Sequence, residues 1–374
     1  MPSNATPREN VSKSISIVAV PPANSSHISY HLQDHTCTYI FIEKPLLNID
    51  TANLLSFPIV NTTMDELYIV VSSYNNAALL PDCLRSVAAA HPGIPTMASV
   101  VDAGSTDGTA ALVRRDFPDV RLIVAAENRG YAALNNLALR EIVAAVPADA
   151  DRTRVAVLLL NADTAMPPDA LMGLLGALAA HPEAGIIGPK IVLRDGSLDL
   201  ACRRSFPTPR TSFWNLTGMA ARYPHSPRFA RYNLTYHDPD EAIEMDSGMG
   251  ACLLVRRAAI DDAGLMDERF FMYGEDLDWC YRIKARGWRV RYEPRVRILH
   301  YKGSSSRQRS IRATLAFYGA MWRFHRLHYA RRTALPLNLL VYAGIGARGL
   351  AALLANILRP ARKRRVASAP TSSQ

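Results

Sequence analysis

The sequence predicts an α/β fold in which a mainly parallel sheet lies between helices. From Glu66 onward, short runs that are apolar at successive positions alternate with segments of helical spacing. Strands of this kind are buried on both faces, as in a parallel sheet covered by helices. Each run ends in polar residues, at the edge where parallel sheets bind ligands. These observations predict a ligand site at the carboxyl edge of the sheet.

The expected elements follow one another in a regular alternation. Strands are expected at residues 67–71, 98–101, 120–124, 155–160, 250–255 and 288–292. Short apolar runs at 186–187 and 191–193 flank Gly188-Pro189, and residues 295–299 are also strand-like. Helices are expected at residues 79–90, after Gly108, at 256–263 and at 276–286. Gly287 stands where a glycine commonly ends a helix, which supports the last of these boundaries.

Two flanking segments differ from this central domain, which we place at residues 65–306. Residues 1–64 are rich in Ser, Thr, Asn and Pro and contain two β-like runs at 14–20 and 39–43, so we expect a poorly ordered or small extension. In residues 307–374 we expect a basic, aromatic-rich amphipathic helix at 311–332 and an apolar helix at 337–358. We expect this tail to associate with membranes.

The charge distribution is asymmetric along the chain. The sequence has 43 basic and 33 acidic residues, but from Tyr281 to the end there are 21 basic residues and one acid, Glu293. A basic tail favours an anionic partner, either lipid or nucleic acid. We prefer lipid because the basic residues flank an apolar segment of about membrane length. Arg348 would be costly at a bilayer centre, which favours an interfacial or re-entrant helix over a single span.

Cysteine usage and the N-terminus bear on location. The five cysteines are scattered and lack C-x-x-C spacing, so we expect buried free thiols in a reducing compartment and no zinc site. A basic region followed by an apolar one is missing from the N-terminus, so no secretory signal is expected. The predicted location is cytoplasmic, peripheral on the inner face of the plasma membrane.

Two aspartates follow apolar runs at the predicted sheet edge. Asp163 follows the run that ends at Leu160, where a carboxylate can hold Mg²⁺ or Mn²⁺ on a diphosphate. Its alternative role is to cap the helix that begins after Pro167-Pro168. Asp102 is followed by a glycine-containing turn, so it can accept a hydrogen bond from a base or ribose, or simply form the turn.

The densest acidic cluster lies at residues 264–280. Glu275, Asp276 and Asp278 open a helix, whose dipole favours carboxylates there. A hydroxyl nucleophile needs a general base, and a carboxylate in a partly apolar cleft can serve as one. The alternative is a solvated acidic turn, against which the preceding aromatic residues argue. His300 is a candidate for contacting a metal or diphosphate, although a single histidine is more often structural.

Six motifs, taken in order, resemble those of family 2 glycosyltransferases, and within that family the bacterial rhamnosyltransferases. The resemblance covers residues 67–306, and each motif by itself is weak. The motifs are Tyr68–Asn76, Val101–Gly108, Asn128–Tyr131, Leu160–Thr164, Gly188–Lys190 and Phe271–Asp278.

The resemblance implies a GT-A fold, which is Rossmann-like, a nucleotide-diphosphate sugar donor, a divalent metal (Mg or Mn) and inversion at the anomeric carbon. It implies Asp276 as catalytic base, with Glu275 as second choice, and Asp163 and His300 at the metal. Asp246 and Asp278 would line the acceptor side. The residues implied at the nucleotide sugar are Ser72, Tyr74, Asp102, Asp107, Asn128 and Asn161.

Two residues depart from the family pattern. Asn161 stands where the metal motif commonly begins with Asp, so one carboxylate carries the site, and Leu134 stands where a small residue is common. The expected reaction is a single displacement in which the metal neutralises the leaving diphosphate and Asp276 takes the acceptor proton. An oxocarbenium-like sugar is expected in between.

The predicted function is transfer of a sugar to a hydroxyl of a cell-surface glycan or lipid-linked acceptor, and the resemblance to rhamnosyltransferases implies rhamnose as that sugar. The alternative is a catalytically inactive, membrane-associated nucleotide-sugar-binding protein, against which the joint presence of Asp163, Asp276 and His300 argues. A processive synthase is excluded because the chain lacks the Gln-x-x-Arg-Trp motif after His300. Nucleic acid is not an expected partner.

Overall fold

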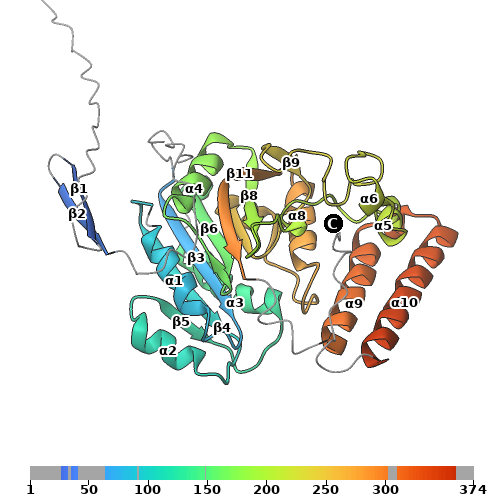
Figure 1. Cartoon of the computed structure of the whole chain (residues 1–374), viewed down its shortest axis with the longest axis horizontal. Coiled ribbons are helices and arrows are strands. Elements are labelled where there is room, and N and C mark those ends of the chain that lie inside the picture. The colour runs from blue at the N-terminus through green and yellow to red at the C-terminus, as the bar shows by residue number, and fades with distance from the viewer. Residues whose placement is uncertain are drawn as a thin grey trace, which may run out of the picture. The chain divides into compact units, whose positions relative to one another are not determined.

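The computed structural model describes residues 27–32, 35–40, 64–90, 92–147, 149–301 and 310–358 (Figure 1). The chain divides into two units, Met1–Pro58 and Ile59–Gln374. The first contains an antiparallel hairpin of β1 (His27–Leu32) and β2 (His35–Ile40). The predicted β-like run at 39–43 overlaps the end of β2, whereas the run at 14–20 lies outside the described residues.

A parallel group of strands forms one half of the nine-stranded sheet of the second unit. Its members are β3 (Glu66–Ser73), β4 (Thr96–Asp102), β5 (Arg121–Val124) and β6 (Val155–Asn161). β3 lies between β4 and β6 and runs parallel to both. All four expected strands are therefore present, and β3 and β6 are buried along most of their length, as their apolar runs predict.

The other half of the sheet mixes directions. β10 (Cys252–Arg256) is antiparallel to β6 and to β8 (Ala184–Val192), and β11 (Arg289–His300) runs parallel to β8. Short strands β7 (Thr164–Ala165) and β9 (Ile243–Met245) pair antiparallel with β11. The predicted strand at 288–292 and the strand-like run at 295–299 form one strand, because a register shift between Glu293 and Arg297 lets β11 continue past Pro294.

Helices cover both faces of this sheet. Figure 1 shows α1 (Leu80–Ala89) and α4 (Ala170–Ala180) on one side, with α3 (Tyr131–Ala145) and α8 (Glu275–Ala285) on the other. α2 (Thr109–Asp116) packs on β4 and β5, and α7 (Arg257–Ala263) packs on α8. α8 ends close to Gly287, whose φ of 94° suits glycine.

An irregular excursion between β8 and β9 carries α5 (Pro209–Leu216) and α6 (Met219–Arg222). The elements expected for this part of the chain did not include either helix. Three short 3-10 turns complete the described secondary structure, at Arg152–Arg154, Leu200–Cys202 and Ala330–Arg332.

The chain's last described elements form a helical hairpin, α9 (Ser310–His328) and α10 (Leu335–Leu358) (Figure 1). α9 packs on the α8 region, where Phe324 and Ala320 join Phe270 and Leu277 in one apolar cluster. Both helices predicted for the tail are present. Several large side chains of α10 are nevertheless exposed, among them Leu335, Leu339, Leu340, Leu350, Leu354 and Leu358.

The cysteines agree with the expectation of free thiols. Cys83, Cys202, Cys252 and Cys280 are buried and free. Burial raises the pKa of Cys83 to about 12, so this thiol stays protonated and unreactive near neutral pH. The side chain of Cys37 lies outside the described part of the chain.

Candidate active site

The polar residues that end the central strands lie side by side. Strand register places Ser72 of β3 opposite Asn161 of β6, and Ser73 of β3 opposite Asp102 of β4. Ser72 and Asp102 are buried, at 8% and 0% exposed. The polar residues at the strand ends therefore lie together at the carboxyl edge of the sheet, as the sequence predicts.

Asp102 and Asp107 organise the loops at this edge. Asp102 accepts hydrogen bonds from the backbone N–H of Ser105 at 2.9 Å and from its hydroxyl. Asp107 accepts from the N–H of Ala77 at 2.9 Å and of Thr109 at 3.1 Å, which joins the loop after β3 to the loop after β4. Burial raises the pKa of Asp107, but these hydrogen bonds outweigh it and lower the pKa overall. Both carboxylates thus shape the turn, and their contacts with a nucleotide remain predictions, as does that of Tyr74.

The start of α3 is held close to the loop before α8. The Asn128 side chain accepts from the N–H of Gly130 at 3.0 Å, and the N–H of Tyr131 donates to the carbonyl of Phe271 at 2.9 Å. A Cβ on Gly130 would lie 2.2 Å from the Phe271 carbonyl oxygen, so only glycine fits there. Asn128 therefore has a structural role beside its predicted contact with the nucleotide sugar.

Tyr131 links the strand ends to α8. Its hydroxyl lies against Ser72 and donates to the carbonyl of Gly250, whose N–H donates to Asp276 at 3.1 Å. Burial, with the nearby carboxylates of Glu275 and Asp276, raises the pKa of Tyr131 well above its usual value, so it remains a neutral donor. Through this chain of contacts the predicted nucleotide-binding and catalytic residues belong to one site.

Asp163 and His300 come together although they are far apart in sequence. β7 pairs with the end of β11 and places His300 Nε2 3.4 Å from Asp163 Oδ1. His300 Nδ1 lies 3.6 Å from Asp199 Oδ2, a carboxylate that the sequence did not single out. Burial alone would lower the pKa of His300, but the two carboxylates outweigh it and raise the pKa to about 9. The capping alternative for Asp163 is wrong, because the N-cap of α4 is Asp169.

A divalent ion fits this pair only with help from a ligand. Within the described residues there is no group of three or more His, Cys, Asp or Glu side chains that could hold a metal by themselves. Asp163 and His300 offer one carboxylate and one imidazole, a donor set that suits Mn²⁺ better than Mg²⁺. Phosphate oxygens would have to complete the coordination shell, as expected for a metal shared with a diphosphate.

Asp276 is the most firmly placed carboxylate of the site. Gly274, with a φ of 80°, precedes α8 and turns the chain so that Asp276 opens the helix. Asp276 Oδ2 lies 2.7 Å from Arg204 Nη2, and the Leu277 N–H donates to Oδ1 at 2.8 Å. Asp276 and Arg204 thus form a buried ion pair. Arg204 is a site residue that sequence reasoning missed, because 72 positions separate it from its partner.

Glu275, the neighbouring carboxylate, has different surroundings. It is 7% exposed, and Oε2 has no hydrogen-bond partner within the described chain. Burial, followed by repulsion from Asp276, raises the pKa of Glu275 to about 8. Near neutral pH the Glu275 carboxyl is therefore largely protonated.

We expect Glu275→Gln to raise the melting temperature at pH 8.5 much more than at pH 5.5. In the unfolded chain Glu275 has its ordinary pKa of 4.5, whereas in the folded protein its pKa is about 8. Between these two pH values the unfolded chain is ionised at Glu275 while the folded protein still holds the proton, so the free energy of unfolding of the wild type decreases as the pH rises. The glutamine side chain of the variant carries no such charge. The shift should be roughly 2–4 °C for each kcal/mol relieved. Glu141→Gln, at an exposed position, is the control, and parallel pH curves for the two variants would contradict the expectation.

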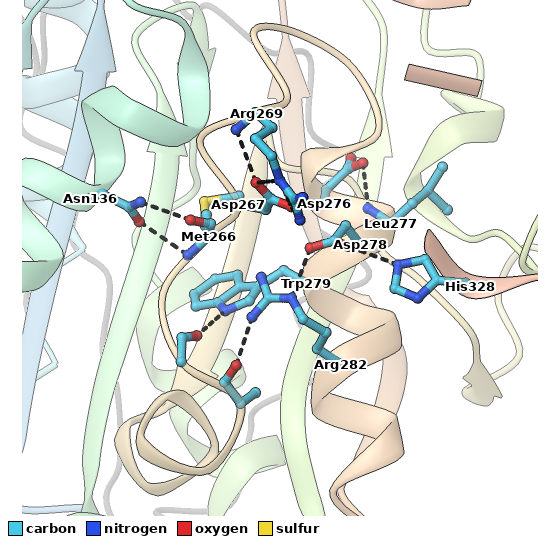
Figure 2. Close-up of polar contacts among 12 residues, drawn as sticks. Asn136, Met266, Asp267, Arg269, Asp276, Leu277, Asp278, Trp279, Arg282 and His328 are labelled. Atoms are coloured by element: carbon cyan, nitrogen blue, oxygen red, sulfur yellow. Dashed lines mark hydrogen bonds and ion pairs between the residues drawn. The ribbon is translucent and has the colours of Figure 1, made fainter. Parts of the chain in front are cut away.

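The two residues predicted on the acceptor side make internal contacts. Figure 2 shows Asp278 between Arg282 and His328, with Oδ2 2.8 Å from Arg282 Nε and Oδ1 2.8 Å from His328 Nε2. Asp278 is 1% exposed. Both its oxygens are thus engaged, and it joins α8 to α9. Asp246 accepts from the Phe206 N–H at 3.0 Å and pairs with Lys284 at 2.9 Å. Their acceptor-side role stays a prediction.

The loop before α8 is also tied to α3. In Figure 2 Asn136 forms two hydrogen bonds with the backbone of Met266, at 2.8 and 3.1 Å. The indole N–H of Trp279 donates to the Gly264 carbonyl at 2.8 Å. This bracing fixes the helix that presents Glu275 and Asp276, and it explains why the acidic cluster is not the solvated turn considered from sequence.

Comparisons with known proteins identify the family. A sequence model described as glycosyltransferase-like family 2 matches residues 65–319. The N-acetylglucosaminyl-diphospho-decaprenol L-rhamnosyltransferase of Mycobacterium tuberculosis (strain H37Rv) is 32% identical over 244 residues, which covers 65% of this chain and 78% of that protein. The low-salt glycan biosynthesis hexosyltransferase Agl10 of Haloferax volcanii is 24% identical over 223 residues, covering 60% and 63%.

Among solved structures, the mannosyltransferase PcManGT from Pyrobaculum calidifontis, in complex with GDP-Man and Mn²⁺, matches with a TM-score of 0.46 and 21% identity, covering 78% of this chain and 72% of that one. The family match extends across the whole nine-stranded sheet and into α9. It confirms the predicted fold class and the predicted enzyme class. This chain belongs to glycosyltransferase family 2 and is a glycosyltransferase similar to bacterial rhamnosyltransferases.

Proposed function

We propose that this enzyme transfers a sugar, rhamnose by its similarity, from a nucleotide-diphosphate donor to a hydroxyl of a lipid-linked acceptor, with inversion of configuration. The observation that carries the proposal is the network of polar contacts that joins Ser72, Tyr131, Gly250 and Asp276. It sets a fixed carboxylate beside the strand ends where nucleotides bind in such sheets. The name of the Mycobacterium relative supports both the sugar and the acceptor class.

Asp163 and His300 would hold the divalent ion together with the donor diphosphate. When bound, that ion supplies Lewis-acid stabilisation of charge on the leaving diphosphate. Asp199 faces the other nitrogen of His300 and orients the ring. Ser72, Asp102 and Asn161 lie at the strand ends where the nucleoside is proposed to bind.

Asp276 is the proposed base. A carboxylate has about four lone-pair sites, and Asp276 uses two on Oδ2, for Arg204 and Gly250, and one on Oδ1, for Leu277. The remaining site on Oδ1 can accept the proton of the acceptor hydroxyl. As the O–H bond breaks, the oxygen bonds to the anomeric carbon, and the bond from that carbon to the diphosphate breaks on the opposite face. Glu275 is the second candidate.

The α9–α10 hairpin is the proposed membrane contact. Among the described helices, α10 alone is long and apolar enough to cross a bilayer, by length and composition. Arg348 on this helix is exposed, which favours a helix lying in the membrane interface. Together with the basic tail, the exposed leucines support a peripheral location on an anionic, cytoplasmic membrane face.

Replacing Leu340, Leu350 and Leu354 by Glu is expected to weaken binding to vesicles of phosphatidylglycerol by at least about tenfold, because burying each leucine in lipid contributes roughly 1.5–3 kcal/mol. Co-sedimentation measures this, with Met97→Glu, at an exposed apolar position of β4, as the control. Equal vesicle binding by both variants, or binding to duplex DNA alone, would contradict the membrane proposal.

The function itself is tested by incubating the purified enzyme with a panel of nucleotide sugars, with Mn²⁺ or with EDTA, and measuring release of nucleoside diphosphate. We expect metal-dependent release from one donor, and dTDP-rhamnose is the first to try. Failure to release diphosphate from any donor, even with membrane-lipid extract as acceptor, would favour the inactive binding protein instead.

A further inference from the structure

A groove of about 380 Å³ lies between α9 and the loop that leads into α8. Arg269, Phe270 and Met272 line it from the loop, and Arg312, Leu315 and Arg323 line it from α9. None of the residues predicted for the donor, metal, catalytic or acceptor sites lines this groove. Its lining combines apolar side chains with three guanidinium groups.

Two of the three arginines have no anionic partner within the described part of the chain. Arg312 lies over the ring of Phe271 and Arg323 over the ring of Phe270, at 6.0 and 5.6 Å from the ring centroids. Neither has a carboxylate within ion-pair distance among the described residues, whereas Arg269 pairs with Asp267 at 2.6 Å. Stacking on an aromatic ring leaves the edge of a guanidinium free to bind phosphate in a bidentate manner.

The spacing on α9 explains the hollow. Residues 312, 316, 319 and 323 recur at helical intervals and so share one face. Ala316 and Gly319 are small, which opens space between the two arginines, and Leu315 beside them is 54% exposed. The groove therefore suits a ligand that carries both a strongly anionic group and an apolar chain.

The same loop connects the groove to the catalytic site. The carbonyl of Phe271 accepts from the N–H of Tyr131 at 2.9 Å on one side. On the other side, a Cβ at Gly274 would lie 3.2 Å from Ala320 of α9, so the loop packs tightly against this helix. Asp276 follows two residues later. A ligand held in the groove would thus direct its next chemical group toward the proposed base.

We propose that this groove binds the diphosphate and first isoprenoid units of a polyprenyl-diphosphate-linked acceptor, and so presents the acceptor sugar to Asp276. The inference rests on the proposed function, which it deepens by locating the acceptor's anionic linker. Arg312 and Arg323 bind the diphosphate oxygens, and Met272 and Leu315 contact the apolar chain. The exposed leucines of α10, on the partner helix of the hairpin, keep this groove near the lipid surface.

The binding test uses the full chain and farnesyl diphosphate, measured by isothermal titration, beside farnesol, inorganic diphosphate and phosphatidylglycerol vesicles. We expect farnesyl diphosphate to bind more tightly than either of its parts. Arg312→Gln and Arg323→Gln should each weaken it roughly tenfold, the scale of one charge-assisted contact. Arg326→Gln, on an exposed part of α9 outside the groove, should change nothing.

The kinetic test measures transfer to a polyprenyl-diphosphate-linked sugar. Arg312→Gln and Arg323→Gln should raise the acceptor KM with kcat and donor affinity unchanged. Unaltered farnesyl diphosphate affinity in both variants, or loss of vesicle binding alone, would contradict acceptor binding in the groove. Neither result would contradict the proposed function. If farnesyl diphosphate affinity falls as expected but the wild-type enzyme transfers no sugar, the groove is supported and the proposed function fails.

Discussion

Asp276→Asn is expected to lower sugar transfer by about 10²–10⁴-fold, the usual contribution of a general base. The amide cannot take the acceptor proton, while its size lets the start of α8 keep its shape. Donor affinity should stay within a few-fold of wild type, because Asp276 faces the acceptor in our account. The measurement is kcat with saturating donor and acceptor, together with the donor Kd.

A control is needed because the Asp276→Asn substitution leaves Arg204 buried without its carboxylate, which can cost about 3–5 kcal/mol of stability. The melting temperature of each variant therefore has to be recorded with its kinetics. Asp116→Asn, an exposed carboxylate on α2, is the matched substitution and should be neutral for rate. An Asp276→Asn enzyme that is folded and retains kcat within about threefold would move the role of base to Glu275.

Asp163→Asn should lower transfer by about 10²–10³-fold, the range for losing one preorganised electrostatic group. It should also weaken Mn²⁺ binding, because Asp163 and His300 are the proposed protein ligands. Electron paramagnetic resonance of Mn²⁺, with and without nucleoside diphosphate, measures the affinity separately from activity. The substitution also removes one of the carboxylates that raise the pKa of His300, so this pKa should fall.

Asp169→Asn is the matched control for Asp163→Asn. It lies six residues along the chain, at the N-cap of α4, where its side chain makes no capping hydrogen bond. We expect nearly wild-type metal affinity and activity for this variant. Metal dependence that survives intact in Asp163→Asn would show that the ion, if one is used, binds elsewhere.

Much of the parallel half of the fold was predictable, because strands buried on both faces appear in the sequence as continuous apolar runs. The polar residues that directly follow these runs were predicted to lie together at the carboxyl edge of the sheet. The strand register confirms this, since Ser72 lies beside Asn161 and Ser73 beside Asp102. Local patterns also revealed the acidic start of α8 and the two helices of the tail.

The mixed half was less predictable, since its strands depend on partners far away in sequence. β8 continues through Gly188-Pro189 because Gly188 leaves space for Met245, whose Cε would lie 2.7 Å from a Cβ there. Two apolar runs that are separate in sequence thus belong to one strand. The runs on either side of Pro294 are likewise joined into β11 by a register shift that no local pattern signals.

The charged partners of the site could not be found from local spacing. Arg204 reaches Asp276, and His328 reaches Asp278, only after the sheet and the helical hairpin have formed. Asp278 was expected at the acceptor, but its burial between Arg282 and His328 gives it the further task of joining α9 to α8. Asp199 likewise lies beside His300 only in the folded chain, and local spacing did not indicate it.

The most direct test is a product analysis by nuclear magnetic resonance after incubation with the active nucleotide sugar, Mn²⁺ and a polyprenyl-diphosphate-linked acceptor. We expect one new glycosidic linkage of inverted anomeric configuration for each nucleoside diphosphate released, and none with Asp276→Asn or Asp163→Asn. Diphosphate release without a new linkage, or a linkage of retained configuration, would contradict direct transfer with Asp276 as the base.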